Sequence, residues 1–417
     1  MAAFRMAPAR NGGATVATSC ILHEYVYVTL CMNLSARLAK APGGFEETMK
    51  QLTVNTASKS YPILVGRGLA STAAAAEALR RAVAGRGCLT VTDSHVGPLY
   101  GTAAESALRA SGAAAVHMAR FPAGEASKTL DTVAELYREA VRAGLDRRSA
   151  VVALGGGVAG DMAGFVAATY MRGIALVQMP TSLLAMVDSS VGGKVGVDLP
   201  EGKNLVGAFH QPELVLADLS CLKTLPAREL RCGLAEIVKY GMIMDAAFLR
   251  RLAAATGPLL ASDLDLYEEV VAHCCRLKAE VVGADEREES GRRAILNYGH
   301  TFGHAIEVLS GYTAFNHGEA VAVGMAMAAD LAVALGRLSA EHAAEQESLL
   351  AALQLPVRVS DPRVKPDLML DAMRRDKKSL RGKLRLVLPL ELGRAEVVGD
   401  LDEALVRQAI GGRCAAA

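Results

Sequence analysis

Two histidines stand four residues apart in the segment NYGHTFGHAIE, residues 297–307, and the surrounding sequence is typical of a helix. Residues four apart share one face of a helix, so His300 and His304 can both face a single cleft. A zinc protease would carry glutamate directly after the first histidine, but Thr301 stands there, which excludes the H-E-x-x-H mechanism. The pair is therefore two metal ligands, one ligand and one proton carrier, or two buried packing residues.

Two further residues elsewhere in the chain fit a metal site with this pair. His317 lies at an expected helix start in FNHGEAVAVGM, and Glu236 lies in GLAEIVKYG, an apolar helix with few other acids. Two histidines, a carboxylate and an open position describe a catalytic zinc site. Taken singly, a histidine on an apolar helix face is more often a hydrogen-bonded core residue than a ligand, so the spacing alone leaves the choice open.

A glycine-rich segment, SAVVALGGGVAGDMAGFVAATY, offers a second kind of chemistry. We expect a buried strand that breaks at residues 155–157 and continues as helix after Gly160, with backbone amides at the loop mouth that suit phosphate. The glycines fit G-x-G-x-x-G, but no acidic residue ends a second strand about 20 residues on, so this is not the ordinary Rossmann fingerprint. The alternative is a tight strand-to-helix turn with Asp161 as the helix cap.

Two more loops place acidic and basic groups after apolar runs. Asp93 ends the strand pattern of LTVTDSHVG, and its carboxylate can accept hydrogen bonds from ribose hydroxyls at the carboxyl edge of a sheet. The loop FPAGEASK offers Glu125 and Lys128 at a similar edge. Three such loops on one sheet predict a dinucleotide site.

The elements that must position these residues follow two successive patterns. From Gln51 to about Leu219, short apolar runs (YPILVG, GCLTVTD, AAAVHMARF, SAVVALGGG and IALVQMP) alternate with amphipathic stretches, which predicts βαβ units and a largely parallel sheet. The sequence then becomes almost wholly helical, and KLRLVLPLELGRAEVVGD can form one hairpin near the end. The expected helices cover residues 233–256, 264–284, 296–310, 317–336 and 340–353.

Length and composition narrow the function classes. A chain of 417 residues predicts two domains, and 51% hydrophobic with 21% charged residues is a globular balance. The net charge of +1 provides no broad basic field for nucleic acid or a membrane surface, so a small acidic ligand held by local lysines and arginines fits better. The eight cysteines form no C-x-x-C pattern, which favours reduced thiols in a cytoplasmic enzyme.

Residues 1–48 differ from the rest and are excluded from the predicted fold. They are rich in alanine and glycine at the start, and their apolar run at 25–34 is too short to span a bilayer. We expect a disordered tail or an over-extended start with Met49 as the natural first residue. A transit peptide, which would imply import into an organelle, is the other interpretation.

Several long motifs together resemble the 3-dehydroquinate synthase family of the shikimate pathway. They are the glycine-rich segment continuing to AFHQP at 208–212, LPARELRCGLAEIVKYG, LNYGHTFGHAIE, NHGEAVAVGM and RRDKKSLRGKLRLVL, in the order of the family, over about residues 49–399. The resemblance implies an α/β fold class: a Rossmann-like NAD-binding α/β domain at 49–219, then a mostly helical metal and substrate domain at 220–417.

The resemblance also implies the division of labour in the histidine pair. Glu236, His300 and His317 would hold Zn²⁺ (or Co²⁺), whereas His304 would sit in the substrate pocket and transfer a proton. The implied reaction converts 3-deoxy-D-arabino-heptulosonate 7-phosphate into 3-dehydroquinate and phosphate. NAD oxidises the substrate at C5, which acidifies the C6 hydrogen and allows phosphate to leave, and NAD is regenerated before the carbocycle closes.

The matching positions nominate two sets of residues. For the substrate they are His304, Lys194, Lys239, Lys278, Arg293, Asn297, Asn204, Asp188, Lys377 and Lys378, with Arg172 lent to the neighbouring active site of a homodimer. For NAD they are Asp93, Glu125, Lys128, Gly156, Gly157, Asp161, Thr181, Ser182, Lys194, Lys203, Cys221, Lys223 and Thr224.

A few positions depart from the family pattern. Ser182 replaces a more usual threonine but keeps the hydroxyl. The segment DEREESGRRAILN is one residue longer than the common pattern, and Arg293 is chosen over Arg292 because it stands four before Asn297.

Three alternatives remain. One is another sugar phosphate cyclase, such as a 2-deoxy-scyllo-inosose or valiolone-type synthase. Another is a metal-dependent polyol dehydrogenase, and the third is a non-catalytic metal-stabilised scaffold.

Overall fold

The computed structural model describes residues 49–375 and 384–414. Residues 49–417 form one compact unit. The interpretations placed on residues 1–48, and the nominated Lys377 and Lys378, lie outside the described residues.

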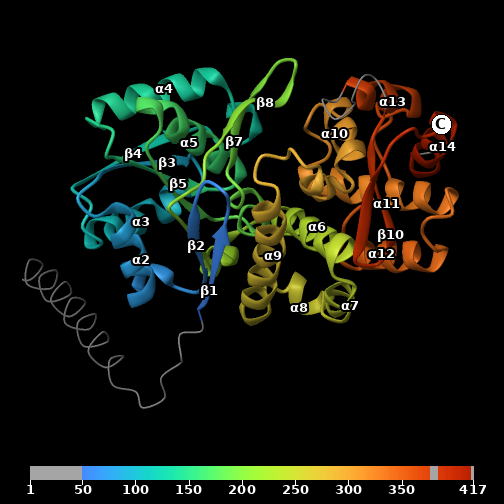
Figure 1. Cartoon of the computed structure of the whole chain (residues 1–417), viewed down its shortest axis with the longest axis horizontal. Helices are drawn as coiled ribbons and strands as arrows, with labels where there is room; N and C mark the ends of the chain where they lie inside the picture. The colour runs from blue at the N-terminus through green and yellow to red at the C-terminus, as the bar shows by residue number, and fades with distance from the viewer. Residues whose placement is uncertain (1–48, 376–383, 415–417) are drawn as a thin grey trace, which may run out of the picture. The chain divides into compact units, whose positions relative to one another are not determined.

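A seven-stranded sheet forms the first half of this unit, with the strand order β1-β2-β9-β6-β5-β3-β4. Figure 1 shows this half of the unit in blue and green, and the helical half in yellow to red. The β1 strand pairs antiparallel with β2, and every other pairing in the sheet is parallel. The strands are β1 (Lys50–Asn55), β2 (Ser60–Gly66), β3 (Gly87–Asp93), β4 (Ala115–Phe121), β5 (Ala150–Gly155), β6 (Ala175–Pro180) and β9 (Leu214–Asp218). The apolar runs predict β2 to β6, whereas they miss β1 and β9. The largely exposed residues of β1 give no apolar run to read.

Helices pack on the sheet and complete a layered α/β arrangement. The α2 helix (Ala73–Val83) and α3 (Val96–Ala110) share a hydrophobic core with β3 and β5, while α4 (Leu130–Arg142) and α5 (Gly157–Thr169) belong to a separate core with the same strands. Since side chains alternate along a strand, the two cores lie on opposite faces of the sheet. The predicted α/β fold class is confirmed by this sheet and by the helices that follow it.

The start of α5 differs from the prediction. The helix begins at Gly157, directly after the strand, and its N-cap residue is Gly156. The prediction that helix resumes only after Gly160 is therefore wrong, and so is the alternative in which Asp161 caps the helix. Asp161 lies one turn inside the helix, where its carboxylate pairs with Lys128 instead.

A second hairpin and several short helical turns complete the connections between these elements. The β7 strand (Lys194–Leu199) pairs antiparallel with β8 (Gly202–Phe209), and β7 packs against α5. The short turns are η1 (Leu69–Ser71), η2 (Glu125–Ser127), η3 (Tyr170–Arg172), the π-helical turn η4 (Ala185–Ser189), η5 (Leu219–Thr224) and η6 (Arg292–Asn297). This hairpin is not predicted from the sequence because glycines interrupt its apolar pattern.

The second half is helical apart from one hairpin, as predicted. Its elements are α6 (Ala227–Met244), α7 (Ala246–Ala254), α8 (Thr256–Leu260), α9 (Leu264–Ala284), α10 (His300–Leu309), α11 (His317–Ala334), α12 (Ala340–Ala352), α13 (Pro366–Arg375), β10 (Leu386–Glu391), β11 (Arg394–Val398) and α14 (Glu403–Arg413). The single helix predicted for 233–256 is wrong: α6 starts earlier, and Asp245 ends it and caps α7. The helix predicted from residue 296 begins at His300, after a 3-10 turn.

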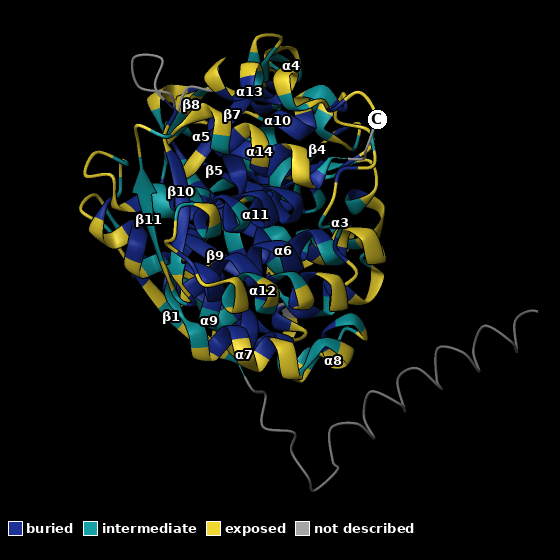
Figure 2. Cartoon of the chain, turned by 90° about the vertical axis from the view of Figure 1, so that its right-hand side faces the viewer, coloured by how far each residue is buried: buried dark blue, intermediate teal, exposed yellow. Residues whose placement is uncertain are grey.

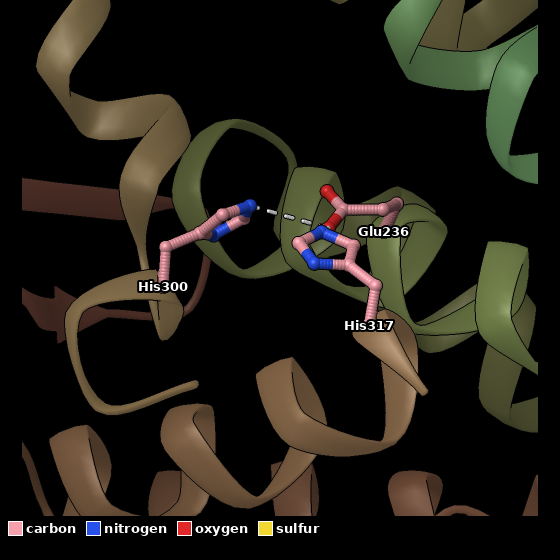
Figure 3. A group of neighbouring side chains, drawn as sticks. All are labelled: Glu236, His300 and His317. Atoms are coloured by element: carbon pink, nitrogen blue, oxygen red, sulfur yellow. Dashed lines mark ion pairs between the residues drawn. The ribbon is translucent and has the colours of Figure 1, made fainter. Parts of the chain in front are cut away.

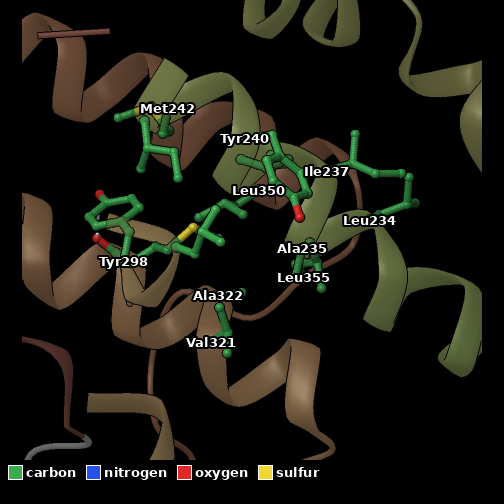
Figure 4. Packing of buried hydrophobic residues seen from close by; sticks show 14 of the residues in the cluster. Leu234, Ala235, Ile237, Tyr240, Met242, Tyr298, Val321, Ala322, Leu350 and Leu355 are labelled. Atoms are coloured by element: carbon green, nitrogen blue, oxygen red, sulfur yellow. Dashed lines mark hydrogen bonds between the residues drawn. The ribbon is translucent and has the colours of Figure 1, made fainter. Parts of the chain in front are cut away.

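One continuous hydrophobic core joins the two halves. It runs from Ile63 of β2 and Val215 of β9 through α6 and α9 to α11 and α12. Figure 4 shows part of it, with Tyr240 and Ile237 from α6 and Val321 from α11 among its members. Figure 2 shows α6 and α11 mostly as buried. The α11 helix is long and apolar enough to cross a membrane, but 72% of it is buried inside the protein, as in the core helix of a globular protein.

Helices α10 and α11 approach each other unusually closely, and this contact fixes the histidines. A Cβ atom added at Gly324 of α11 would lie 2.1 Å from the carbonyl oxygen of Gly299 and 2.9 Å from the amide nitrogen of Gly303. Gly299 has φ 78°, a left-handed conformation that side chains disfavour, and it leads directly into His300. Glycine at these positions therefore sets the separation of the two helices.

Candidate metal and cofactor site

Three side chains from three helices converge in the helical part (Figure 3). Glu236 comes from α6, His300 from α10 and His317 from α11, and their candidate ligand atoms all lie within 4.8 Å of one another. The Nε2 atom of His300 is 3.5 Å from Oε1 of Glu236, and Nε2 of His317 is 3.4 Å from the same oxygen. The sequence prediction that these three residues meet is thus consistent with the geometry.

Local structure orients each of the two histidines. The Nδ1 atom of His300 lies 3.0 Å from the carbonyl oxygen of Tyr298, so a proton on Nδ1 leaves the ligating lone pair on Nε2, the atom that faces Glu236. His317 is the first residue of α11, which Asn316 and Glu319 begin with a reciprocal capping box. This cap is a local sequence signal, and it confirms the helix start expected at His317.

The carboxylate of Glu236 fits a cation. Its side chain is completely buried, and the Lys239 ammonium forms an ion pair with its Oε2 while Oε1 faces the two histidines. Burial raises the pKa of Glu236, but the Lys239 ammonium and the two histidines outweigh it and lower the pKa to about 2. A buried, ionised carboxylate next to two imidazoles is the donor set of a catalytic zinc site. The residues present therefore fit a divalent metal.

His304 lies beside this group and is not one of its three members. Its ring centroid is 5.6 Å from that of His300 and 6.4 Å from that of His317. It is half-buried, one turn further along α10. This position places a third imidazole at the edge of the group.

Two buried lysines around Asp188 adjoin the metal group, as we call Glu236, His300 and His317. Asp188 of η4 accepts from Nζ of Lys278 at 2.9 Å and from the hydroxyl of Tyr240 at 2.7 Å, and Nζ of Lys239 is 3.7 Å away. Lys239 also forms an ion pair with Glu236. Burial raises the pKa of Asp188, but the two lysines hold it well below its usual value. Three nominated residues thus form one network that contacts a candidate metal ligand.

A second cluster lies at the loop between α9 and η6. Lys194 at the start of β7 forms an ion pair with Glu288, and the side-chain amide of Asn297 lies 3.4 Å from the same carboxylate. The guanidinium of Arg293 is buried and donates to the carbonyl oxygens of Gly192 and Glu286. Glu288, which the sequence analysis did not nominate, therefore brings together two nominated substrate residues.

The nominated cofactor loops meet at one edge of the sheet. Since β3 pairs in parallel with both β4 and β5, the loops that follow these three strands leave the same edge. The chain moves outward to β4 and then returns to the other side of β3, so the strand order reverses between β3 and β5. Asp93 and the Gly155 loop flank this reversal, which is where dinucleotides bind in open α/β sheets. The Thr181 amide donates to the Gly155 carbonyl, which holds the next loop against it.

Charged pairs connect these loops to the β7–β8 hairpin. Nζ of the buried Lys128 bonds to Oδ2 of Asp161 and to Oδ1 of Asn204, both at 2.6 Å. Nζ of Lys203 lies 3.2 Å from Glu125 and 3.0 Å from Glu307 of α10. Lys203 thus joins a cofactor loop to the helix that carries His300.

The remaining nominated residues lie in three places. Thr224 bonds to the hydroxyl of Tyr100 on α3, the helix that follows Asp93, and Cys221 and Lys223 share its turn η5. Gly156 lies next to Ser182, because a Cβ added there would be 3.3 Å from the serine hydroxyl. Arg172 is on the exposed turn at the far end of α5 from the glycine loop.

Known proteins are similar in sequence to most of this chain. The sequence profile for the N-terminal part of 3-dehydroquinate synthase matches residues 118–232, and the profile for its C-terminal part matches residues 233–379. The 3-dehydroquinate synthase of Symbiobacterium thermophilum is 52% identical over 349 residues, which cover 83% of this chain and 96% of that protein. The chain belongs to the 3-dehydroquinate synthase family.

Two solved structures are similar to this family member. A 2-deoxy-scyllo-inosose synthase complexed with carbaglucose-6-phosphate, NAD⁺ and Co²⁺ has a TM-score of 0.77 at 29% identity, with 87% of this chain and 99% of that chain covered. A 2-epi-5-epi-valiolone synthase from Streptomyces hygroscopicus subsp. jinggangensis 5008, with NAD⁺ and Zn²⁺ bound, has a TM-score of 0.75 at 31% identity and covers 85% and 96%. The chain is thus more similar in sequence to the 3-dehydroquinate synthase, at 52% identity, than to these two cyclases, at 29% and 31%.

Two further residues at the site lie within the quoted motifs but were not nominated by the sequence analysis. Tyr240 donates to Asp188, and Glu307 lies 3.6 Å from Nδ1 of His317. Glu307 stands seven residues after His300, a spacing that returns to the same helix face. That spacing is the signal that could have identified it.

Proposed function

We propose that this chain is a 3-dehydroquinate synthase that converts 3-deoxy-D-arabino-heptulosonate 7-phosphate into 3-dehydroquinate and phosphate. The observation that carries the proposal is the convergence of Glu236, His300 and His317 beside a buried cation network. Membership of the family supplies the reaction. A substrate with both a phosphate and a carboxylate needs several cations at close range, and the site offers them.

The cofactors supply the redox and Lewis-acid chemistry. When bound, NAD accepts a hydride from C5 of the substrate and returns it, and a divalent metal polarises the C5 hydroxyl oxygen. Glu236, His300 and His317 would hold Zn²⁺ or Co²⁺, and the glycine loop with Asp93 would hold NAD. The solved cyclases with NAD⁺ and Co²⁺ or Zn²⁺ support this assignment.

The side chains around the metal bind and orient the substrate. The ketone at C5 makes the hydrogen at C6 acidic, and its loss allows phosphate to leave. His304 is the group we assign to proton transfer, because its imidazole lies at the edge of the metal group, beside the rings of two ligands. Lys194, Asn297 and Arg293 form one anion-binding group, and Lys239 with Lys278 forms another around Asp188. After C5 is reduced again, the ring opens and the enolate attacks the C2 carbonyl.

The chain also provides support for a homodimer in which Arg172 enters the partner's active site. The α5 helix, thirteen residues long, separates Arg172 from the glycine loop of its own chain by roughly 20 Å. An arginine side chain is shorter than that length, which supports a role for Arg172 in the site of a second subunit rather than at the glycine loop of its own chain. We further propose a cytoplasmic location and a division into an NAD-binding part at 49–219 and a metal and substrate part at 220–417.

A substrate comparison tests the function. Phosphate release would be measured with heptulosonate 7-phosphate, glucose 6-phosphate and sedoheptulose 7-phosphate, each with NAD and with or without a chelator. We expect release from the first substrate alone, abolished by the chelator. Release from either of the others would indicate another cyclase, net NADH accumulation would indicate a polyol dehydrogenase, and no turnover with NAD and metal restored would indicate a scaffold.

The division of roles between the two histidines has its own test. His300→Ala should abolish metal retention, because it removes one of three ligands. His304→Ala should leave metal and NAD bound but slow turnover. Metal content after dialysis, measured for both variants beside the unaltered protein, decides the matter, since equal metal loss would contradict these roles.

A further inference from the structure

The carboxylate of Glu307 is buried in the metal group but is not one of its three ligands. Its residue is 3% exposed, although burying a carboxylate is costly unless it gains partners. Its Oε1 atom is 3.6 Å from Nδ1 of His317 and 3.0 Å from Nζ of Lys203, whereas its Oε2 receives no hydrogen bond from the described residues. His317 and Lys203 thus both face Oε1 of Glu307.

The geometry around His317 leaves Nδ1 as the atom to be positioned. Its Nε2 faces Glu236 at 3.4 Å, so Nδ1 points to the opposite side, toward Glu307. A histidine that binds a metal through one nitrogen usually donates a hydrogen bond from the other to a carboxylate or a carbonyl, which fixes the ring and its tautomer. His300 has such a partner in the carbonyl of Tyr298. Glu307 is the corresponding group for His317.

The distance of 3.6 Å between Nδ1 of His317 and Oε1 of Glu307 is slightly longer than a hydrogen bond, and a small rotation of either side chain would shorten it to one. Glu307 is placed for this because α10 carries it on the same face as His300, seven residues on. We propose that Glu307 is a positioning residue that orients His317 for metal binding through a hydrogen bond from Nδ1. This inference rests on the proposed metal site.

The competing interpretation is that Glu307 serves only to hold Lys203 for the cofactor. Lys203 also pairs with Glu125, so it keeps a carboxylate partner when Glu307 is changed. The two interpretations differ in what happens to the metal when Lys203 is removed. If Glu307 acts through His317, loss of Lys203 leaves metal affinity nearly unchanged, but if Glu307 acts through Lys203, both substitutions have the same effect.

The test measures Co²⁺ affinity of the full chain without NAD or substrate, by competition with a chromophoric chelator. Glu307→Gln should weaken Co²⁺ binding by about 10–100-fold, the usual effect of losing a carboxylate behind a ligating histidine. The visible absorption bands of bound Co²⁺ should shift as well, since the ligand field changes. Lys203→Met should change the affinity by less than about threefold, because His317 and Glu307 both remain.

Folding is monitored in every variant by thermal unfolding in the presence of chelator. If Glu307→Gln does not fold, Glu307→Asp replaces it, since the shorter carboxylate keeps the charge but withdraws from Nδ1 and should still bind Co²⁺ more weakly. Unchanged affinity in the variant that folds, or equal losses with Lys203→Met, would overturn the inference. Absence of Co²⁺ binding by the unaltered chain would instead refute the proposed metal site.

Discussion

Replacing Gly324 by alanine tests whether the close packing of α10 and α11 creates the metal group. The added Cβ would lie 2.1 Å from the Gly299 carbonyl oxygen, and real Cβ atoms essentially never approach another heavy atom within 3.0 Å. Backbone atoms form this contact, so no side chain can rotate away. The two helices must separate by about 1 Å, an overpacking that costs roughly 1–3 kcal/mol of folding free energy.

The same displacement reaches the ligands. Gly299 precedes His300, and Gly324 follows His317 by two turns of α11. Ligand distances in metal sites are held to within about 0.2 Å, so a shift of about 1 Å between the helices exceeds the tolerance several-fold. Gly324→Ala should therefore lower both the stability of the metal-free protein and its affinity for Co²⁺ or Zn²⁺.

Gly411→Ala is the matched control. This glycine lies in α14, is exposed, and has no heavy atom within 4 Å of the added Cβ. Alanine there should leave metal affinity unchanged and should raise stability by up to about 1 kcal/mol, because glycine is a poor helix former. Thermal unfolding with chelator gives the stability, and chelator competition gives the affinity. If Gly324→Ala behaves like Gly411→Ala in both measurements, the packing argument is refuted.

Two further predictions concern stability. Arg413 is buried and bonds to both carboxylate oxygens of Asp330 and to Glu347, so Arg413→Ala should cost about 2–3 kcal/mol in urea unfolding. Arg407→Ala, which breaks an exposed pair, should cost less than about 0.5 kcal/mol, and equal losses would contradict the prediction. Burial raises the pKa of Asp285, but hydrogen bonds from the backbone amides of the following loop outweigh burial and lower the pKa to about 2. The ionised carboxylate therefore stabilises the fold above about pH 4, and this stabilisation is lost as the pH falls through about 2. Asp285→Asn should therefore lower the free energy of unfolding by about 1–2 kcal/mol at pH 7. Urea unfolding of both proteins at pH 7, 5, 4 and 3 should show the difference between them shrinking as the pH falls below about 4. A difference that stays constant with pH would show that the charge of Asp285 is not the cause.

Local sequence patterns were sufficient for much of the fold. The apolar runs predicted β2 to β6, and the change to long amphipathic stretches predicted the helical second half. They failed where tertiary context outweighs local preference. After β5 the chain enters helix at once, at Gly157, because Gly155, Gly156 and Gly157 carry no side chains that would hinder so tight a turn. The break between α6 and α7 depends on Asp245, a cap that a continuous apolar pattern concealed.

The sequence by itself determined which residue types are available for chemistry. The i, i+4 histidines and the helix start expected at His317 are local signals that made these residues candidates, and the resemblance carried by the motif order implied which of them hold the metal. Only the tertiary structure decided which groups meet. Lys203 reaches Glu125 and Glu307, and Asp188 reaches Lys278, across separations of about 80 to 105 residues that no periodicity encodes. The physical reason is that burial of charge demands partners wherever the packed helices and the sheet edge bring them together.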